Sequence, residues 1–219
     1  MTQRPALRIR PRVLRRLARQ QRGSAVTEFG LIAPVFFMLL MGIYDITHMV
    51  YARSVFDGAV ERAAREASLE TADTEAADQM VENSIRPILP DVVLTTERES
   101  YFDFADIKRA EQWTDNKGKD SSGNWINYPG LNNGVCDYGE PYFDENRSGH
   151  WDADIGVSGN GGAGDVVMYT VTATYSPLFK VPFMPDAWKT RSMTATAIKK
   201  NQPFANQTTY ASTVATCNS

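Results

Sequence analysis

An abrupt change from charged to apolar residues occurs near the start of the chain. The run from Phe29 to Tyr44 contains no charged side chain, and between Ser24 and Tyr44 the one charged residue is Glu28. Such a run is close to the ~20 residues that an α-helix needs to cross the hydrocarbon core of a bilayer. The pattern therefore predicts a membrane-spanning helix.

The helical pattern continues beyond the apolar run, up to about residue 70. Small and apolar residues recur there at helical spacing, and charged residues lie between them. The recurring positions are Val55, Ala59, Val60, Ala63, Ala64 and Ala67. A second amphipathic helix is expected at about 74–86, where Thr74 can cap the start and Pro87 ends the helix.

Alternation with a period of two residues predicts the strands. Residues 166–175 and 192–199 both alternate in this way, and residues 91–96 form a shorter candidate. Helices followed by strands are typical of the α+β class. We expect an α+β fold in which the second helix and a small antiparallel sheet pack on the continuation of the long helix.

The formal net charge of −3 hides an uneven distribution. Residues 1–23 hold eight of the 23 basic residues and no acidic one, so the remaining chain carries 15 basic and 26 acidic residues, a net charge of −11. An acidic body lacks the cationic surface that phosphates require, so we expect no nucleic acid among the partners. Under the positive-inside rule the arginines stay in the cytoplasm, which places residues 45–219 outside it.

Two ordinary explanations of this N-terminal pattern remain open. One is a secretory signal peptide cut on the outer side of the membrane, although the best site, at Val50-Tyr51-Ala52, lies well past the apolar run. The other is an uncleaved signal anchor. The pair Arg15-Arg16 hints at a twin-arginine signal, but the flanking residues do not support one.

The position of Glu28 favours a third explanation. A carboxylate at the edge of a membrane helix is costly, and Gly23 lies five residues before it. Cleavage after Gly23 would create an α-amine at Ser24, which is largely cationic because its free-chain pKa is about 8. The amine of one subunit could then compensate the Glu28 carboxylate of its neighbour.

These residues resemble a known family. Gly-x-x-x-x-Glu-Phe before an apolar helix resembles the prepilin-peptidase motif of type IV pilins, with Gly23, Glu28 and Phe29 as its fixed positions. More narrowly, Arg-Gly-Ser-Ala-Val-Thr-Glu-Phe-Gly-Leu-Ile-Ala-Pro-Val-Phe, residues 22–36, resembles TadE-like proteins, the pseudopilins of Tad (Flp) pilus systems. The similarity is closest over residues 22–70 and looser over 166–204, and residues 100–165 carry an insertion that the family pattern does not explain.

The resemblance implies an organisation and a function. It implies a basic leader, residues 1–23, that an aspartyl prepilin peptidase removes on the cytoplasmic side. A transmembrane and amphipathic helix, 24–70, would follow, and then a pilin-like periplasmic head, 71–219. The chain would be a single-pass inner-membrane minor pilin that could enter an extracellular pilus. Its partners would be the membrane, other pilin subunits, the pilus assembly platform and the peptidase.

An acidic loop at about 134–165 is rich in Asp, Asn and Gly. Its stretch Asp144 to Asp154 follows the start of a calcium-binding loop, with oxygen ligands on alternate residues and Gly149 at the sharp turn. It resembles EF-hand, dockerin-type and thrombospondin-type loops. The expected ligands are Asp144, Asn146, Ser148, the carbonyl of His150, Asp152 and Asp154.

The last position of the calcium pattern departs from the EF-hand, since Ile155 stands where a bidentate glutamate is usual. An acid must then come from elsewhere, with Asp154, Asp137, Glu140 and Asp165 as candidates. We expect calcium as a cofactor. The alternative is a solvated loop, because Asp, Asn and Gly also make ordinary turns.

Cys136 and Cys217 are the two cysteines of the chain. In an oxidising compartment they could form a disulfide that ties the acidic loop to the C-terminal segment, while two free thiols are the alternative. No zinc spacing, phosphate-binding glycine motif or nucleophile constellation stands out, so we expect no enzyme. The function alternative to a minor pilin is a membrane-tethered calcium-binding or adhesive protein that does not polymerise.

Overall fold

The computed structural model describes residues 22–69, 73–119, 122–127, 133–179, 189–203, 205–207 and 212–218. The chain divides into two compact units, Met1–Met49 and Val50–Ser219. The expected leader up to residue 21 lies outside the described residues. The fold is α+β, as the sequence predicts, with a long apolar N-terminal helix, a second helix and antiparallel sheets.

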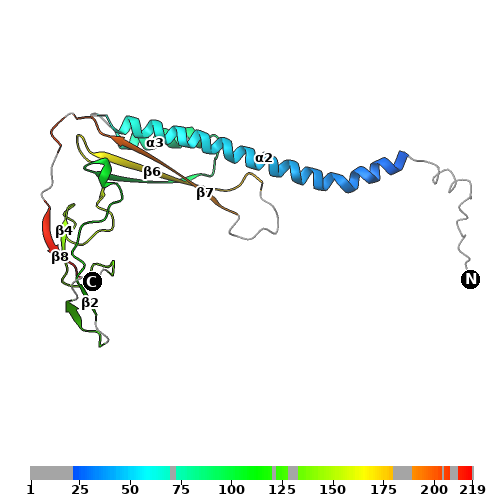
Figure 1. The fold of residues 1–219 in the computed structure, drawn as a ribbon. Coiled ribbons are helices and arrows are strands. Elements are labelled where there is room, and N and C mark those ends of the chain that lie inside the picture. The colour runs from blue at the N-terminus through cyan, green and yellow to red at the C-terminus, as the bar shows by residue number, and fades with distance from the viewer. Residues whose placement is uncertain are drawn as a thin grey trace, which may run out of the picture. The chain divides into compact units, whose positions relative to one another are not determined.

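The long helix, α2, runs from Arg22 to Ala67 and has 46 residues. Its apolar part reaches a mean hydropathy of 2.0 over 18 residues, none of which is buried, so its length and composition suit a membrane span. Pro34 lies inside this part. Proline removes a backbone donor and kinks a helix, and the blue part of α2 changes direction in Figure 1.

The second helix, α3 (Thr74–Ile85), starts from a different cap than the sequence suggested. Asp73, not Thr74, is the N-cap residue, and its side chain accepts hydrogen bonds from the backbone N–H groups of Glu75 and Ala76. A carboxylate at this position satisfies free helix donors and also interacts favourably with the helix dipole. Thr74 is the first residue of the helix itself.

The main sheet has the strand order β5-β1-β6-β7, and all of its pairs are antiparallel. Its strands are β1 (Val93–Tyr101), β5 (Val157–Ser158), β6 (Val166–Tyr175) and β7 (Arg191–Lys200). The prediction for β6 is confirmed at both ends, and β7 extends one residue beyond its prediction on each side. β1 begins later and ends later than residues 91–96.

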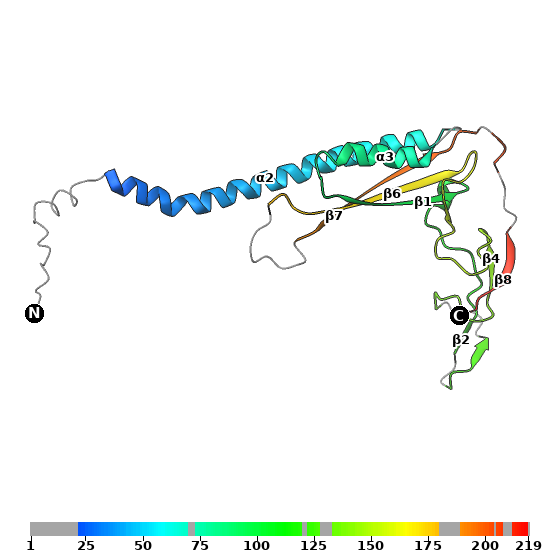
Figure 2. The same cartoon turned by 180° about the vertical axis from the view of Figure 1, so that it is seen from behind.

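The main core lies between the two helices and one face of this sheet. Figures 1 and 2 both show α2 and α3 side by side over the same strands. On α2 five of the six predicted residues are buried, Val55 is half-buried, and Phe56 joins them with no exposed surface. The strands contribute alternate residues of β6 and β7: Tyr169, Val171, Ala173, Tyr175, Met193, Ala195 and Ala197. Alanines on α2 let the helix lie close to these side chains.

Short elements occupy the inserted segment. They are the 3-10 helix η1 (Phe104–Asp106) and the strands β2 (Lys117–Lys119), β3 (Trp125–Asn127) and β4 (Pro141–Asp144). β2 pairs with β3, while β4 pairs with β8 (Thr213–Thr216). The inserted segment therefore holds one small sheet of its own, β2–β3, and shares a second with β8.

Candidate functional site

The processing motif lies at the start of α2. Gly23 and Ser24 belong to its first helical turn, and Glu28 lies one turn after Ser24. Glu28 is exposed, and the Phe29 side chain is 64% exposed. Residues four apart lie on the same side of a helix, so an amine at Ser24 and the Glu28 carboxylate would belong to one helix face.

The apolar surface after Glu28 surrounds the helix. Leu31, Phe36 and Phe37 are 81%, 51% and 52% exposed, although their positions face three different directions around the axis. A helix that is apolar on all sides requires lipid or other apolar helices around it. This part of α2 is thus a candidate membrane anchor.

Within the acidic loop, the stretch 144–154 begins at the last residue of β4. Asp144 is only 4% exposed, and its two carboxylate oxygens accept hydrogen bonds from the backbone N–H groups of Ser148 (3.1 Å) and Gly149 (3.0 Å). Gly149 has φ +81°, a conformation that suits glycine. The chain therefore turns tightly around the Asp144 carboxylate.

Hydrogen bonds join most of the expected ligands. The amide nitrogen of Asn146 donates to Asp152 (2.9 Å), and the Ser148 hydroxyl donates to the carbonyl of His150 (2.7 Å). The Nε2 atom of His150 lies 3.1 Å from Asp152. The structure brings Asp144, Asn146, Ser148, His150 and Asp152 together. No group of three or more His, Cys, Asp or Glu side chains within the described part of the chain is arranged to hold a metal ion.

The other candidate ligands lie elsewhere. Asp154 accepts hydrogen bonds from the Tyr101 hydroxyl (3.1 Å) and from the backbone N–H of Gly156 (3.0 Å). Asp165 accepts the backbone N–H of Gly162 (2.7 Å) and the side-chain amide of Gln207 (2.8 Å). Both carboxylates are engaged in holding turns and loops.

Glu140 and Asp137 belong to a neighbouring turn. Glu140 is fully buried, and its carboxylate accepts three backbone N–H groups, from Asn116 (2.6 Å), Lys117 (2.6 Å) and Asp137 (2.9 Å). Asp137 itself accepts the side-chain amide of Asn133. Glu140 thus organises the backbone around it.

Glu111 lies outside the acidic loop but contacts it, and the sequence patterns did not reveal this carboxylate. It is 1% exposed, and its oxygens accept the backbone N–H groups of Glu145 (2.8 Å) and Asp152 (3.0 Å). Burial raises the pKa of Glu111, and the charges of Asp152 and Asp144 add to this shift, although the two backbone hydrogen bonds oppose it. No motif marks Glu111, because its partners lie more than thirty residues away.

The predicted disulfide between Cys136 and Cys217 is present, with a Cα–Cα distance of 5.8 Å. The two cysteines form a small core with Tyr142. Trp113 and Trp151 pack against this core. Backbone hydrogen bonds on either side, from Gly139 N to Cys217 O and from Cys217 N to Glu140 O, fix the same junction. The bond therefore ties the acidic segment to the strand β8.

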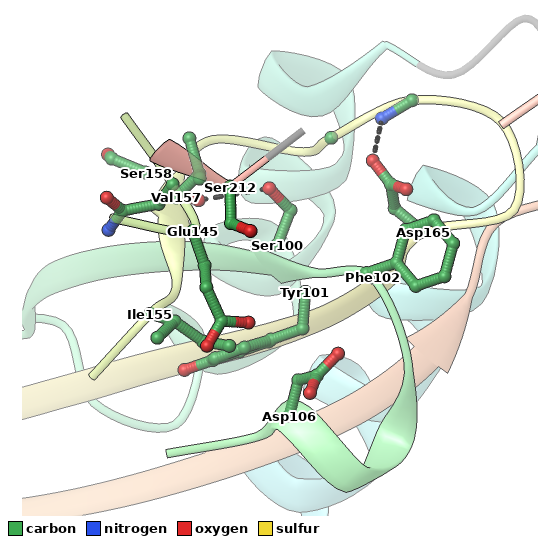
Figure 3. Close-up of a pocket in the computed structure, with 13 residues that line it drawn as sticks. Ser100, Tyr101, Phe102, Asp106, Glu145, Ile155, Val157, Ser158, Asp165 and Ser212 are labelled. Atoms are coloured by element: carbon green, nitrogen blue, oxygen red, sulfur yellow. Dashed lines mark hydrogen bonds between the residues drawn. The ribbon is translucent and has the colours of Figure 1, made fainter. Parts of the chain in front are cut away.

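A cavity of about 360 Å³ lies beside the acidic loop. Figure 3 shows the ring of Tyr101 near Ile155 and Glu145, and Asp165 bonded to a loop nitrogen. Arg109 forms ion pairs with two acids that line the cavity, Asp106 (3.0 Å) and Glu145 (2.7 Å).

The titratable side chains among the described residues that line the cavity are all engaged in hydrogen bonds or ion pairs. Burial raises the pKa of the Tyr101 hydroxyl, and its hydrogen bonds to Asp154 and Glu99 raise it further. The phenol is therefore neutral at physiological pH and acts as a donor. Its acceptors, and the acids held by Arg109, stabilise loops.

A family model described as TadE-like protein matches residues 23–65. A search of curated proteins and a search of solved structures found no match for the chain. The matched residues coincide with most of α2, in front of an α+β fold, and this combination is consistent with a TadE-like pseudopilin. The match links the chain to Tad pilus systems, and the matched family is structural rather than catalytic.

Proposed function

We propose that this chain is a minor pilin, or pseudopilin, that takes part in the assembly of a Tad (Flp) type IV pilus. The observation that carries the proposal is the start of α2, where an exposed carboxylate, Glu28, precedes an apolar surface that surrounds the helix. The TadE-like match over residues 23–65 supports the same function.

The first step of the proposed function is processing. A prepilin peptidase cuts between Gly23 and Ser24, removes the arginine-rich leader on the cytoplasmic side and leaves an α-amine at Ser24. The arginines hold the N-terminus in the cytoplasm, and the head lies in the periplasm. The chain is then a single-pass protein of the inner membrane that can enter an extracellular pilus.

The second step is assembly with other pilin subunits on the assembly platform. The apolar part of α2 packs against equivalent helices, where the Glu28 carboxylate would be poorly solvated. The cationic amine at Ser24 of a neighbouring subunit compensates it, because a paired charge in an apolar environment costs far less than a single one. Each subunit offers one amine and one carboxylate, so stacking satisfies both.

The N-terminal residue of the mature protein tests the proposal. The full-length chain is expressed with and without a Tad prepilin peptidase, and the N-terminus is determined by mass spectrometry. Ser24 is expected only when the peptidase is present. An N-terminus at Met1, Thr2 or Arg53 in its presence would overturn the pilin proposal.

A matched pair of variants separates processing from insertion. Gly23→Leu places a large side chain next to the scissile bond and is expected to block cleavage while the chain stays in the membrane. Gly30→Leu adds the same side chain further along α2, where a Cβ meets nothing within 4 Å, and is expected to leave cleavage intact. Equal cleavage of both variants would contradict the assigned site.

A further inference from the structure

Backbone hydrogen bonds hold the segment of Glu111 against the acidic loop. Its own N–H donates to the carbonyl of Asp152 (2.9 Å), and the N–H of Ile155 donates to the carbonyl of Arg109 (2.9 Å). The segment on the other side of Glu111 is bonded to β4, from Phe143 N to Gln112 O (2.9 Å). The Glu111 side chain is therefore fixed between the two ends of the loop that starts at Asp144.

Three carboxylates then lie around this loop: Glu111, Asp144 and Asp152. Those of Glu111 and Asp144 are held by backbone N–H groups, and the three do not converge on one point in this structure. Among the described residues, no ion pair joins a lysine or arginine to any of them. The nearby guanidinium of Arg109 is engaged by Asp106 and Glu145. Glu111 and Asp144 are buried, while Asp152 is partly exposed and has the exposed imidazole of His150 beside it. Buried negative charges without a positive partner are costly, so the region of Glu111 and Asp144 favours a cation.

The hydroxyl of Tyr142 is an independent sign of a ligand. Tyr142 is 1% exposed, and its hydroxyl has no hydrogen-bond partner among the described residues. It precedes Asp144 by two residues on β4, so both side chains lie on the same, buried side of the strand. A buried polar atom without a partner needs one.

Ile155 explains why the acid comes from outside the loop. At 8% exposure it packs with Tyr101, Val166 and Met168 in a separate small core. A glutamate there would bury a charge among apolar side chains. The position that closes the usual calcium loop is thus used for packing in this protein, and a carboxylate must reach the loop from another segment.

We propose that the loop binds one calcium ion and that Glu111 supplies the acid that the loop itself lacks. The remaining ligands are oxygens of Asp144, Asn146, Ser148, His150 and Asp152. All of these donors are oxygens, which calcium prefers. When calcium binds, it replaces the hydrogen bonds of Asn146 to Asp152 and of Ser148 to His150. This proposal is independent of the proposed pilin function, because calcium binding is measured on the purified chain and requires neither processing nor assembly.

Calorimetry and thermal unfolding of the full-length chain in detergent micelles test this site. After dialysis against EDTA, calcium is expected to bind with a Kd of about 10⁻⁴ M, as in extracellular modules, and to raise the melting temperature. Magnesium is expected to bind more weakly, because it requires stricter octahedral geometry. A wild-type chain with no heat and no melting shift at millimolar calcium would overturn the proposal.

Variants test the role of Glu111. Glu111→Gln and Asp152→Asn are each expected to weaken calcium binding about tenfold or more. Glu111→Asp keeps the charge but shortens the side chain by one methylene group, so it is also expected to weaken calcium binding. This variant provides the test if Glu111→Gln does not fold. Unchanged affinity in a folded Glu111 variant would remove Glu111 from the site.

Glu140→Gln is the matched control. Glu140 is also a buried glutamate that accepts backbone N–H groups, so its loss is expected to lower the stability of the calcium-free protein. Calcium affinity is expected to stay within about twofold of the wild type. A tenfold loss of affinity in this variant would show that calcium responds to the general stability of the segment, and would overturn the assignment.

Discussion

Asp78 of α3 and Arg98 of β1 form an ion pair that joins the helix to the sheet, with 2.5 Å between Oδ1 and Nη2. The Tyr169 hydroxyl of β6 also donates to Asp78, and the Arg98 guanidinium lies 4.3 Å from the centre of the Tyr169 ring. The Arg98 side chain is only 12% exposed. One carboxylate therefore connects a helix with two strands.

Asp78→Asn is expected to destabilise the head by about 1–3 kcal/mol, since it leaves the largely buried Arg98 without a negative partner. Thermal unfolding of the full-length chain in detergent measures the loss. Glu82→Gln on the same helix is the control, because Glu82 forms an exposed pair with Arg86 and its loss should cost less than about 0.5 kcal/mol. Similar losses in both variants would contradict the role of Asp78.

Asp73→Ala is expected to destabilise the protein by about 0.5–2 kcal/mol, because the first N–H groups of α3 lose their acceptor. Thr74→Ala is the control and is expected to have little effect, since Thr74 is already inside the helix. Thermal unfolding and helix content by circular dichroism measure both. A larger loss of stability in Thr74→Ala than in Asp73→Ala would indicate that Thr74, and not Asp73, is the N-cap residue.

The elements that the sequence predicted well are those with local periodicity. The small residues of α2 and the alternation of β6 depend on burial of one face, which a single segment displays by itself. β1 was predicted too short because Glu97, Arg98 and Glu99 interrupt its apolar pattern. Arg98 can face the core side because Asp78 compensates its charge. Asp78 belongs to α3, so the sequence of β1 alone does not indicate this partner.

In the acidic loop, too, the sequence revealed the local residues but not the partner from another segment. The spacing from Asp144 to Asp152 indicated which residues would come together, because they belong to one turn of chain. Glu111 comes from a segment more than thirty residues earlier, and Glu140 forms a separate buried centre. Tertiary pairing of loop backbones decides which acid enters the loop, and this pairing leaves no local pattern.

Reduction of the Cys136–Cys217 bond is expected to lower stability by up to about 4 kcal/mol, the loop-entropy estimate for a ring of this size. Thiol labelling under denaturing, non-reducing conditions should detect no free thiol, and two after reduction. The Cys136→Ser/Cys217→Ser double variant is the control, because its melting temperature should not respond to the reductant. Two free thiols before reduction would exclude the bond in the mature protein.

Glu28→Gln is expected to leave membrane insertion intact and to impair incorporation into pili or the assembly complex. The amide keeps the shape of the side chain but cannot balance the amine of a neighbour. Membrane fractionation and quantification of the subunit in sheared pili measure the two effects. Wild-type incorporation of the variant would contradict the pairing of Glu28.

The raised pKa of Glu111 predicts a pH effect in the absence of calcium. Between its usual value of 4.5 and the raised value, the folded protein retains a proton that the unfolded chain releases. Stability contributed by this group is therefore present at low pH and is lost as the pH rises through that window. Thermal unfolding in EDTA across this range should show the trend in the wild type, with a flatter profile in Glu111→Gln. Identical profiles would contradict the burial of an ionisable group at this position.

The disulfide also has a topological consequence. Cys136 and Cys217 are separated by 81 positions, and the covalent ring that they close contains β6 and β7 but not β1, α2 or α3. A protease that makes a single cut between the two cysteines leaves both products joined in one molecule, and the nicked chain keeps the two longest strands of its sheet attached to the helices. Wherever reductants are scarce, one cleavage in this region would therefore not release a fragment of the chain.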